Sequence, residues 1–165
     1  MAATEGTEVR YAQMAKTGLL ALLIVQAAHM TEHVAQVIQK FVLLMPVAHG
    51  FLGAWFDFEW VHFTFNLLIW VPLVAVYIWY RRSGALMPFA LSTIVWFQGY
   101  HFVEHVVKMY QYYALGVVIA PKGILGYIFP VIWLHFWLNL IVLVLIAGSF
   151  LSVTAGARRM ALATS

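Results

Sequence analysis

Hydrophobic residues fill four long stretches of the chain, separated by short segments that contain polar or turn-forming residues. The stretches run from Thr17 to Met45, from Trp60 to Tyr80, from Met87 to Leu115 and from Pro130 to Val153. Each is long enough to cross the hydrocarbon core of a bilayer, which is about 30 Å thick and takes about 20 helical residues. The pattern predicts an all-α membrane protein in which residues 1–165 form a single domain, a bundle of four transmembrane helices.

Polar residues inside the first and third stretches follow the period of a helix. Because positions three and four apart share one helical face, they form two stripes. The stripe of the first stretch comprises Gln26, His29, Glu32, His33, Gln36 and Lys40. The stripe of the third stretch comprises Gln98, His101, Glu104, His105, Lys108 and Gln111. Lipid cannot satisfy such side chains, so we expect both stripes to face the interior of the bundle.

The two stripes belong to a longer internal repeat. An offset of 72 residues places Gln26, His29, Glu32, His33 and Val34 on Gln98, His101, Glu104, His105 and Val106. An offset of 73 places Gly50, Leu52, Gly53, Phe56, Trp60, His62, Phe63, Asn66 and Leu67 on Gly123, Leu125, Gly126, Phe129, Trp133, His135, Phe136, Asn139 and Leu140. This pattern predicts a tandem duplication of a two-helix unit, repeat 1 at about 17–84 and repeat 2 at about 87–157. We expect a pseudo-two-fold axis along the membrane normal to relate the two units.

Composition excludes several classes of protein. The chain is 64% hydrophobic and 9% charged, against roughly 45–50% and 25% in soluble domains. The absence of cysteine excludes disulfides, thiolate metal sites and iron–sulfur clusters, so a metal would need nitrogen or oxygen ligands. A net charge of +3 without a basic stripe gives no indication of nucleic-acid binding.

The distribution of Arg and Lys predicts the orientation in the membrane. One side would carry Arg10, Lys16, Arg81, Arg82, Arg158 and Arg159, and the other Lys40, Lys108 and Lys122. Cytoplasmic segments of membrane proteins contain more Arg and Lys than the segments on the other side. We therefore expect a multi-pass protein with both termini in the cytoplasm. At about 1.5 Å per residue, His29 to His33 then lie roughly 20–26 Å from Lys16. The polar constellation is therefore expected in the outer half of the bilayer.

The repeated histidines and glutamates suggest a metal site. Two mid-membrane carboxylates cost about 2.5–3.5 kcal/mol each, and an interhelical hydrogen bond contributes only about 0.6 kcal/mol. A bound divalent metal contributes far more, about 10–16 kcal/mol for structural zinc in small domains. We expect two transition-metal ions, each held by three histidines and a glutamate. The expected ligands are His29, Glu32, His33, His62, His101, Glu104, His105 and His135.

The mixture of histidine and carboxylate ligands favours non-haem iron, with zinc, manganese or copper as alternatives. Four amides at aligned positions are expected to orient the ligands: Gln26, Asn66, Gln98 and Asn139. Other interpretations of the cluster are b-type haem in an electron-transfer protein, a metal-free polar or proton-relay network, and ion passage. H-x-x-E-H also matches the inverzincin protease motif, but its occurrence in both repeats makes coincidence the better explanation.

The depth and apolar surroundings of such a site favour redox or oxygen chemistry on a lipophilic substrate, if the protein is an enzyme. A non-enzymatic role in metal binding or transport, or as an accessory subunit of a larger membrane complex, is the alternative. Membrane lipid is the expected surrounding, and a homo-oligomer is also compatible with the sequence.

Polar residues near the outer ends of the helices are expected to be solvated. Gln36, Gln39 and Lys40 would mark the wet end of the first helix, and Lys108 and Gln111 that of the third. His49, Asp57 and Glu59 have no counterparts in repeat 2, where the aligned positions hold Lys122, Pro130 and Ile132. We expect them to form an ordinary polar loop, with an entrance for protons, ions or substrate as the alternative.

Overall fold

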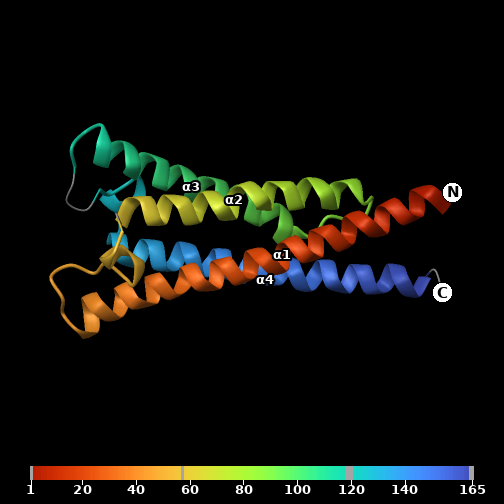
Figure 1. Ribbon diagram of the computed structural model, residues 1–165, viewed down its shortest axis with the longest axis horizontal. Helices are drawn as coiled ribbons and strands as arrows, with labels where there is room; N and C mark the ends of the chain where they lie inside the picture. Colours follow the sequence, from red (N-terminus) through yellow and green to blue (C-terminus); the bar gives the residue numbers. More distant parts are fainter. Residues whose placement is uncertain (1, 57, 118–120, 164–165) are drawn as a thin grey trace.

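The computed structural model describes residues 2–56, 58–117 and 121–163, and it is helical in all its regular elements (Figure 1). The long helices are α1 (Ala2–Val37), α2 (Phe58–Arg82), α3 (Phe89–Tyr113) and α4 (Val131–Ala163). Their apolar faces and helix-forming residues account for the elements that the hydrophobic pattern predicts. The prediction of an all-α chain with four long helices is confirmed.

Three short elements shape the loops. A π-helix, η1 (Ile38–Val42), continues α1, and the 3-10 turns η2 (Leu52–Ala54) and η3 (Leu125–Tyr127) lie in the loops that precede α2 and α4. Gly50 and Gly123 introduce these turns with φ angles of 75° and 70°. Such positive angles are readily available to glycine because it lacks a Cβ atom. The G-[FI]-L-G segments therefore begin with a backbone conformation that glycine permits.

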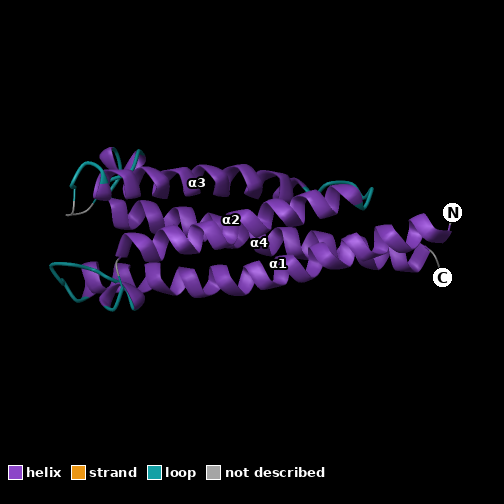
Figure 2. Cartoon of the chain, turned by 45° about the horizontal axis from the view of Figure 1, so that its top comes forward, coloured by secondary structure: helices purple, strands orange, loops and turns teal. Residues whose placement is uncertain are grey.

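The four helices form an antiparallel bundle in which each helix packs against two others. α1 and α3 each contact both α2 and α4. Both chain termini and the α2–α3 connection point toward one end of the bundle, and the two glycine-containing loops lie at the other (Figures 1 and 2). We call these the terminal end and the loop end.

The interior of the bundle changes character along its length. At the terminal end, residues from all four helices form an apolar core, for example Leu19, Leu73, Leu91 and Ile146, each fully buried. At the loop end, polar side chains replace apolar ones in the interior, beginning at Gln26, Asn66, Gln98 and Asn139. The apolar half packs the helices together, and the polar half contains the candidate site.

The outer surface of the bundle is apolar. Ile24, Leu68, Trp96 and Val144 are 64%, 55%, 79% and 61% exposed. Three segments, Gly6–Val42, Glu59–Arg82 and Val131–Arg159, are long and apolar enough to cross a membrane. A polar interior with an apolar exterior is the arrangement expected in lipid, so the fold is consistent with a membrane protein.

The structure corrects the expected helix ends. α1 begins at Ala2 instead of near Thr17, and α4 continues to Ala163. Helix-forming residues extend both helices beyond the apolar stretches from which the spans were predicted. The boundaries of α2 and α3 lie within two residues of the predicted ones.

Candidate metal centre

Six of the seven histidines lie buried in the interior at the loop end. α1 contributes His29 and His33 and α2 contributes His62, which together we call the first triad. α3 contributes His101 and His105 and α4 contributes His135, the second triad. The helical spacing places both histidines of α1, and both of α3, on one inward face. The remaining histidine, His49, is exposed in the loop between η1 and η2.

The six imidazole rings form one continuous cluster. Within the first triad the ring centroids are 4.7–5.6 Å apart, and within the second 4.9–5.9 Å. Two stacked pairs join the triads: His62 with His105 at 5.9 Å and His33 with His135 at 6.3 Å. The structure therefore brings the predicted histidines of both halves together across the bundle.

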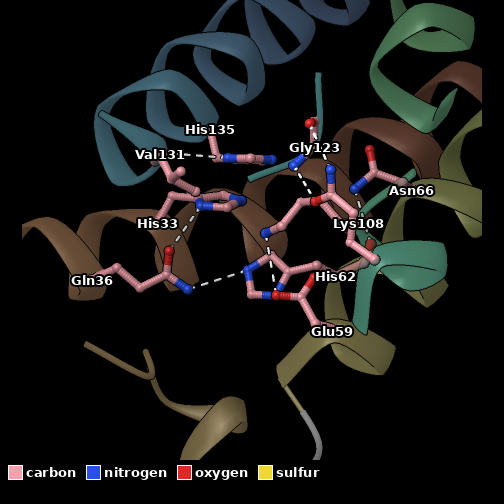
Figure 3. Close-up of polar contacts among 10 residues, drawn as sticks. His33, Gln36, Glu59, His62, Asn66, Lys108, Gly123, Val131 and His135 are labelled. Atoms are coloured by element: carbon pink, nitrogen blue, oxygen red, sulfur yellow. Dashed lines mark hydrogen bonds and ion pairs between the residues drawn. The ribbon is translucent and has the colours of Figure 1, made fainter. Parts of the chain in front are cut away.

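Amide side chains form hydrogen bonds with ring nitrogens of the first triad (Figure 3). His33 Nδ1 donates to Gln36 Oε1 at 3.1 Å, and Gln36 Nε2 donates to His62 Nε2 at 3.2 Å. Asn139 Nδ2 donates to His33 Nε2 at 2.8 Å, and His29 Nε2 lies 3.2 Å from the same nitrogen. The lone pairs that would bind a metal thus already accept hydrogen bonds on His33 and His62.

The second triad has fewer hydrogen bonds than the first, in which Nδ1 of His29 is also buried without a partner among the described residues. Both ring nitrogens of His101 and of His105, together with Nε2 of His135, are buried without a hydrogen-bond partner among the described residues. One ligand nitrogen from each of the three lies within 4.8 Å of the others. Buried polar atoms ordinarily have partners, so convergent unpaired nitrogens indicate a missing ligand. These three side chains could hold one metal ion.

The orientation of His135 fits a ligand role. Its Nδ1 donates to the backbone carbonyl of Val131 at 2.9 Å (Figure 3). A carbonyl oxygen only accepts, so the proton resides on Nδ1 and the lone pair of Nε2 is directed toward the cluster. Metal-binding histidines are commonly oriented in this way by a backbone carbonyl.

A buried ion pair replaces the amide of the first triad. Lys108 aligns with Gln36 and binds Glu59 of α2, with Nζ and Oε1 3.2 Å apart (Figure 3). Their side chains are 3% and 4% exposed. The expectation that Lys108 and Glu59 are solvated is therefore wrong, because the loop end packs around them. Sequence reasoning missed this pair because the two residues lie 49 positions apart, and only the lack of a polar counterpart for Glu59 signalled it.

The two glutamates of H-x-x-E-H bind the loops. Glu32 accepts hydrogen bonds from the backbone N–H groups of Phe51 and Leu52 at 2.6 and 2.9 Å. Glu104 accepts from those of Ile124 and Leu125 at 2.9 and 2.8 Å. Both carboxylates thus receive two backbone N–H groups at the start of a 3-10 turn. Metal ligation by these glutamates stays a prediction, since the structure gives each of them another partner.

Two glutamines fasten the same loops. Gln39 accepts from the N–H of Gly50 at 2.8 Å and donates to its carbonyl at 3.0 Å. Gln111 makes the same two hydrogen bonds with Gly123, at 2.8 and 3.0 Å. Gln36 and Gln111 are buried, and Gln39 is half-buried. The expectation that these helix ends are solvated is therefore wrong for Gln36 and Gln111. The loops fold back over these helix ends and exclude solvent.

The four amides expected to orient the ligands pair between the halves. Gln26 Nε2 donates to Asn139 Oδ1 at 3.1 Å, and Gln98 Nε2 donates to Asn66 Oδ1 at 2.9 Å. Asn66 and Asn139 each donate to the carbonyl of the histidine four residues earlier, at 2.9 Å. They form a layer between the apolar core and the histidines. Of the residues without a counterpart in repeat 2, His49 is exposed and Asp57 lies outside the described residues.

In comparisons with protein-family models, with curated proteins and with solved structures, nothing matches this chain. The function of the protein is therefore inferred from its site alone. Three buried histidines lie close enough together to hold a metal, in a helical protein with helices that are apolar enough to span a membrane.

Proposed function

We propose that the protein is an integral membrane metalloprotein with a transition-metal centre at the loop end of its bundle. The observation that carries the proposal is the second triad, whose convergent ring nitrogens lack partners among the described residues. Leaving several buried polar atoms unpaired costs about 1–3 kcal/mol each. A metal ion would satisfy three of these nitrogens at once and use neutral imidazole directly.

The second triad is the principal site, and the first triad is the place of a second ion. Ligation at the first triad requires that Gln36 and Asn139 give up their hydrogen bonds to His33 and His62. The second ion is therefore the more weakly bound. Three imidazoles suit iron, zinc and copper. The preference for iron and the case for manganese both depend on a carboxylate ligand, so they require Glu32 or Glu104 to reach the metal.

We further propose that α3 crosses the membrane with the other three helices. Its 25 residues are long enough to span the hydrocarbon core, and its polar residues, from Gln98 to Gln111, are buried in the bundle. With four crossings, both termini lie on one side, and the Arg and Lys distribution makes that side the cytoplasm. The loop end, with the metal centre, then lies in the outer half of the bilayer.

A tandem duplication is the simplest origin of this arrangement. Glu32 and Glu104 bind backbone groups at aligned loop positions, and so do Gln39 and Gln111. The Gln26–Asn139 and Gln98–Asn66 pairs are reciprocal between the halves. Such reciprocal pairs are what a pseudo-two-fold axis along the bundle produces.

The chemistry we propose is redox or oxygen chemistry on a lipophilic substrate. A site with three protein ligands leaves a position open for a further ligand, as catalytic metal sites do. A role in metal storage, transfer or electron transfer within a larger membrane complex is the alternative, and it requires a saturated coordination sphere.

Elemental analysis combined with an optical spectrum of the detergent-purified protein tests the proposal. We expect one strongly bound transition-metal ion per chain, lost in His105→Ala and retained in His49→Ala, which changes the exposed histidine. The result that overturns the proposal is the absence of stoichiometric metal in protein that is folded and reloaded with iron, zinc or copper. A Soret band would instead assign the cluster to haem.

A further inference from the structure

An open apolar groove lies beside the first triad, on the outer surface of the bundle. It has a volume of about 300 Å³ and is lined by Leu52 and Phe56 of the first outer loop and by one face of α2 between Trp60 and Leu68. This volume is at the lower limit of small-ligand pockets. Its lining residues other than Thr64 are aliphatic or aromatic.

The floor of the groove touches the histidine cluster. Phe65 lines the groove, and its ring lies against His29 with centroids 4.6 Å apart and planes 31° apart. His29 itself is fully buried. One aromatic ring therefore separates the groove from the first triad.

The second half of the chain carries different residues at several of the aligned lining positions. Thr64 aligns with Trp137, whereas the other lining positions are apolar in both halves. Phe65 aligns with the smaller Leu138. An indole is larger than a threonine side chain, so the aligned face of α4 carries more side-chain volume than the face of α2 that lines the groove. The two halves thus differ in the size of two adjacent side chains on this helical face.

We propose that this groove binds the hydrocarbon chain of a lipophilic molecule dissolved in the bilayer and brings its reactive end to the histidines past Phe65. The inference rests on the proposed function and identifies its substrate class and entrance. The groove faces the same surroundings as the exposed apolar residues of α2, such as Leu68 and Val71. Since the outer loops are fastened to α1 and α3 by glutamate and glutamine, lateral entry from lipid avoids opening them.

Photolabelling tests the groove without reference to metal. Protein in phosphatidylcholine vesicles is irradiated with a fatty acid that carries a diazirine near its methyl end, and labelled peptides are mapped by mass spectrometry. We expect labelling of the Trp60–Leu68 segment, a decrease of about tenfold in Thr64→Trp, and a new label beside α4 in the reciprocal variant Trp137→Thr. If labelling of the Trp60–Leu68 segment is unchanged in Thr64→Trp, the proposal that the groove binds the hydrocarbon chain is wrong.

Metal removal tests the connection between the groove and the site. With metal-loaded protein in the same vesicles, 1,10-phenanthroline represents an apolar ligand and EDTA a water-soluble one. Thr64→Trp should slow removal by phenanthroline by about tenfold, and Phe65→Ala should accelerate it, whereas Trp137→Thr should not slow it. Removal by EDTA should be the same in all four proteins.

The two failures are distinguishable. Equal phenanthroline rates in wild type and Thr64→Trp, with metal bound, would refute lateral entry while leaving the metal centre intact. A protein that binds no metal but loses photolabelling in Thr64→Trp would refute the metal centre and retain the lipid groove.

Discussion

The two histidine triads occupy aligned positions of the chain, yet their ring nitrogens have different partners. In the first triad, Gln36 and Asn139 satisfy His33 and His62 through hydrogen bonds. In the second, every ring nitrogen except His135 Nδ1 lacks a hydrogen-bond partner among the described residues, and one nitrogen from each ring converges on the others. Repetition of residue types therefore does not by itself produce two equivalent sites.

One aligned difference accounts for much of this contrast. Gln36 both accepts and donates hydrogen bonds, so it can bridge two imidazoles. Lys108, at the aligned position, only donates, and it binds the Glu59 carboxylate. With the lysine bound to Glu59, the second triad lacks the amide bridge that Gln36 forms between His33 and His62 in the first.

The largest expected effect is on metal binding by the second triad. His105→Ala removes one of three ligands, and we expect metal affinity to fall by more than the roughly 10–100-fold typical of residues that only orient a ligand. His33→Ala should lower metal content less, because His33 already has amide partners. Both should also lower the melting temperature. Elemental analysis of the two variants beside His49→Ala measures the difference, and equal losses in both would abolish the distinction between the triads.

The next effect concerns the buried ion pair. Lys108→Gln gives the second half the residue of the first and removes the ammonium group that binds the buried Glu59 carboxylate, which should destabilise the protein by about 3–5 kcal/mol. Adding Glu59→Ile removes the carboxylate as well, since isoleucine is the residue at the aligned position 132. The double variant should recover most of the lost stability. Denaturant titration in detergent measures both variants. If the single and the double variant are equally unstable, the ion pair is not the cause.

The double variant also sharpens the comparison of the triads. A glutamine at position 108 should donate to and accept from the second triad as Gln36 does in the first. We therefore expect the double variant to be folded but to bind metal more weakly than the wild type. Unchanged metal affinity would show that the amide does not compete with the ion.

A smaller effect is expected at the loop glycines. An added Cβ at Gly50 would overlap the Glu32 carboxylate, and one at Gly123 would lie 2.6 Å from Glu104 Oε1. Alanine at either position should cost about 1–2 kcal/mol for its left-handed backbone and about 1–3 kcal/mol more for the displaced carboxylate. Gly116→Ala is the matched control, since its φ is 67° but no atom lies near an added Cβ. Thermal unfolding of the three variants separates backbone strain from the clash with the carboxylate. Equal losses of stability in all three would show that the clash contributes nothing.

The smallest effect is expected in the amide layer. Gln26→Ala and Gln98→Ala each remove interhelical hydrogen bonds, which are worth about 0.6 kcal/mol on average within membranes. The two should lower stability by similar amounts. Only Gln26→Ala should also alter the first triad, because its partner Asn139 donates to His33. Metal titration of the first triad should show this difference. Identical titrations of the two variants would show that Gln26 does not affect His33 through Asn139.

The sequence by itself determined the helices and the inward direction of their polar stripes. Long apolar runs predict spans, and a spacing of three and four residues places His29 with His33, and His101 with His105, on one helical face. It also indicated which residue types recur, because the aligned positions can be read without coordinates. These are local properties, decided by hydrophobicity and helical geometry.

Only the tertiary structure decided what each polar side chain binds. The carboxylates of Glu32 and Glu104 meet the backbone of loops that are 19 to 21 residues away in the chain, and Lys108 meets Glu59 on another helix. A hydrogen bond or ion pair depends on the relative position and rotation of two elements to within a few tenths of an ångström. Residue spacing within one helix carries no such information, so the difference between the two triads emerged only when the four helices were packed together.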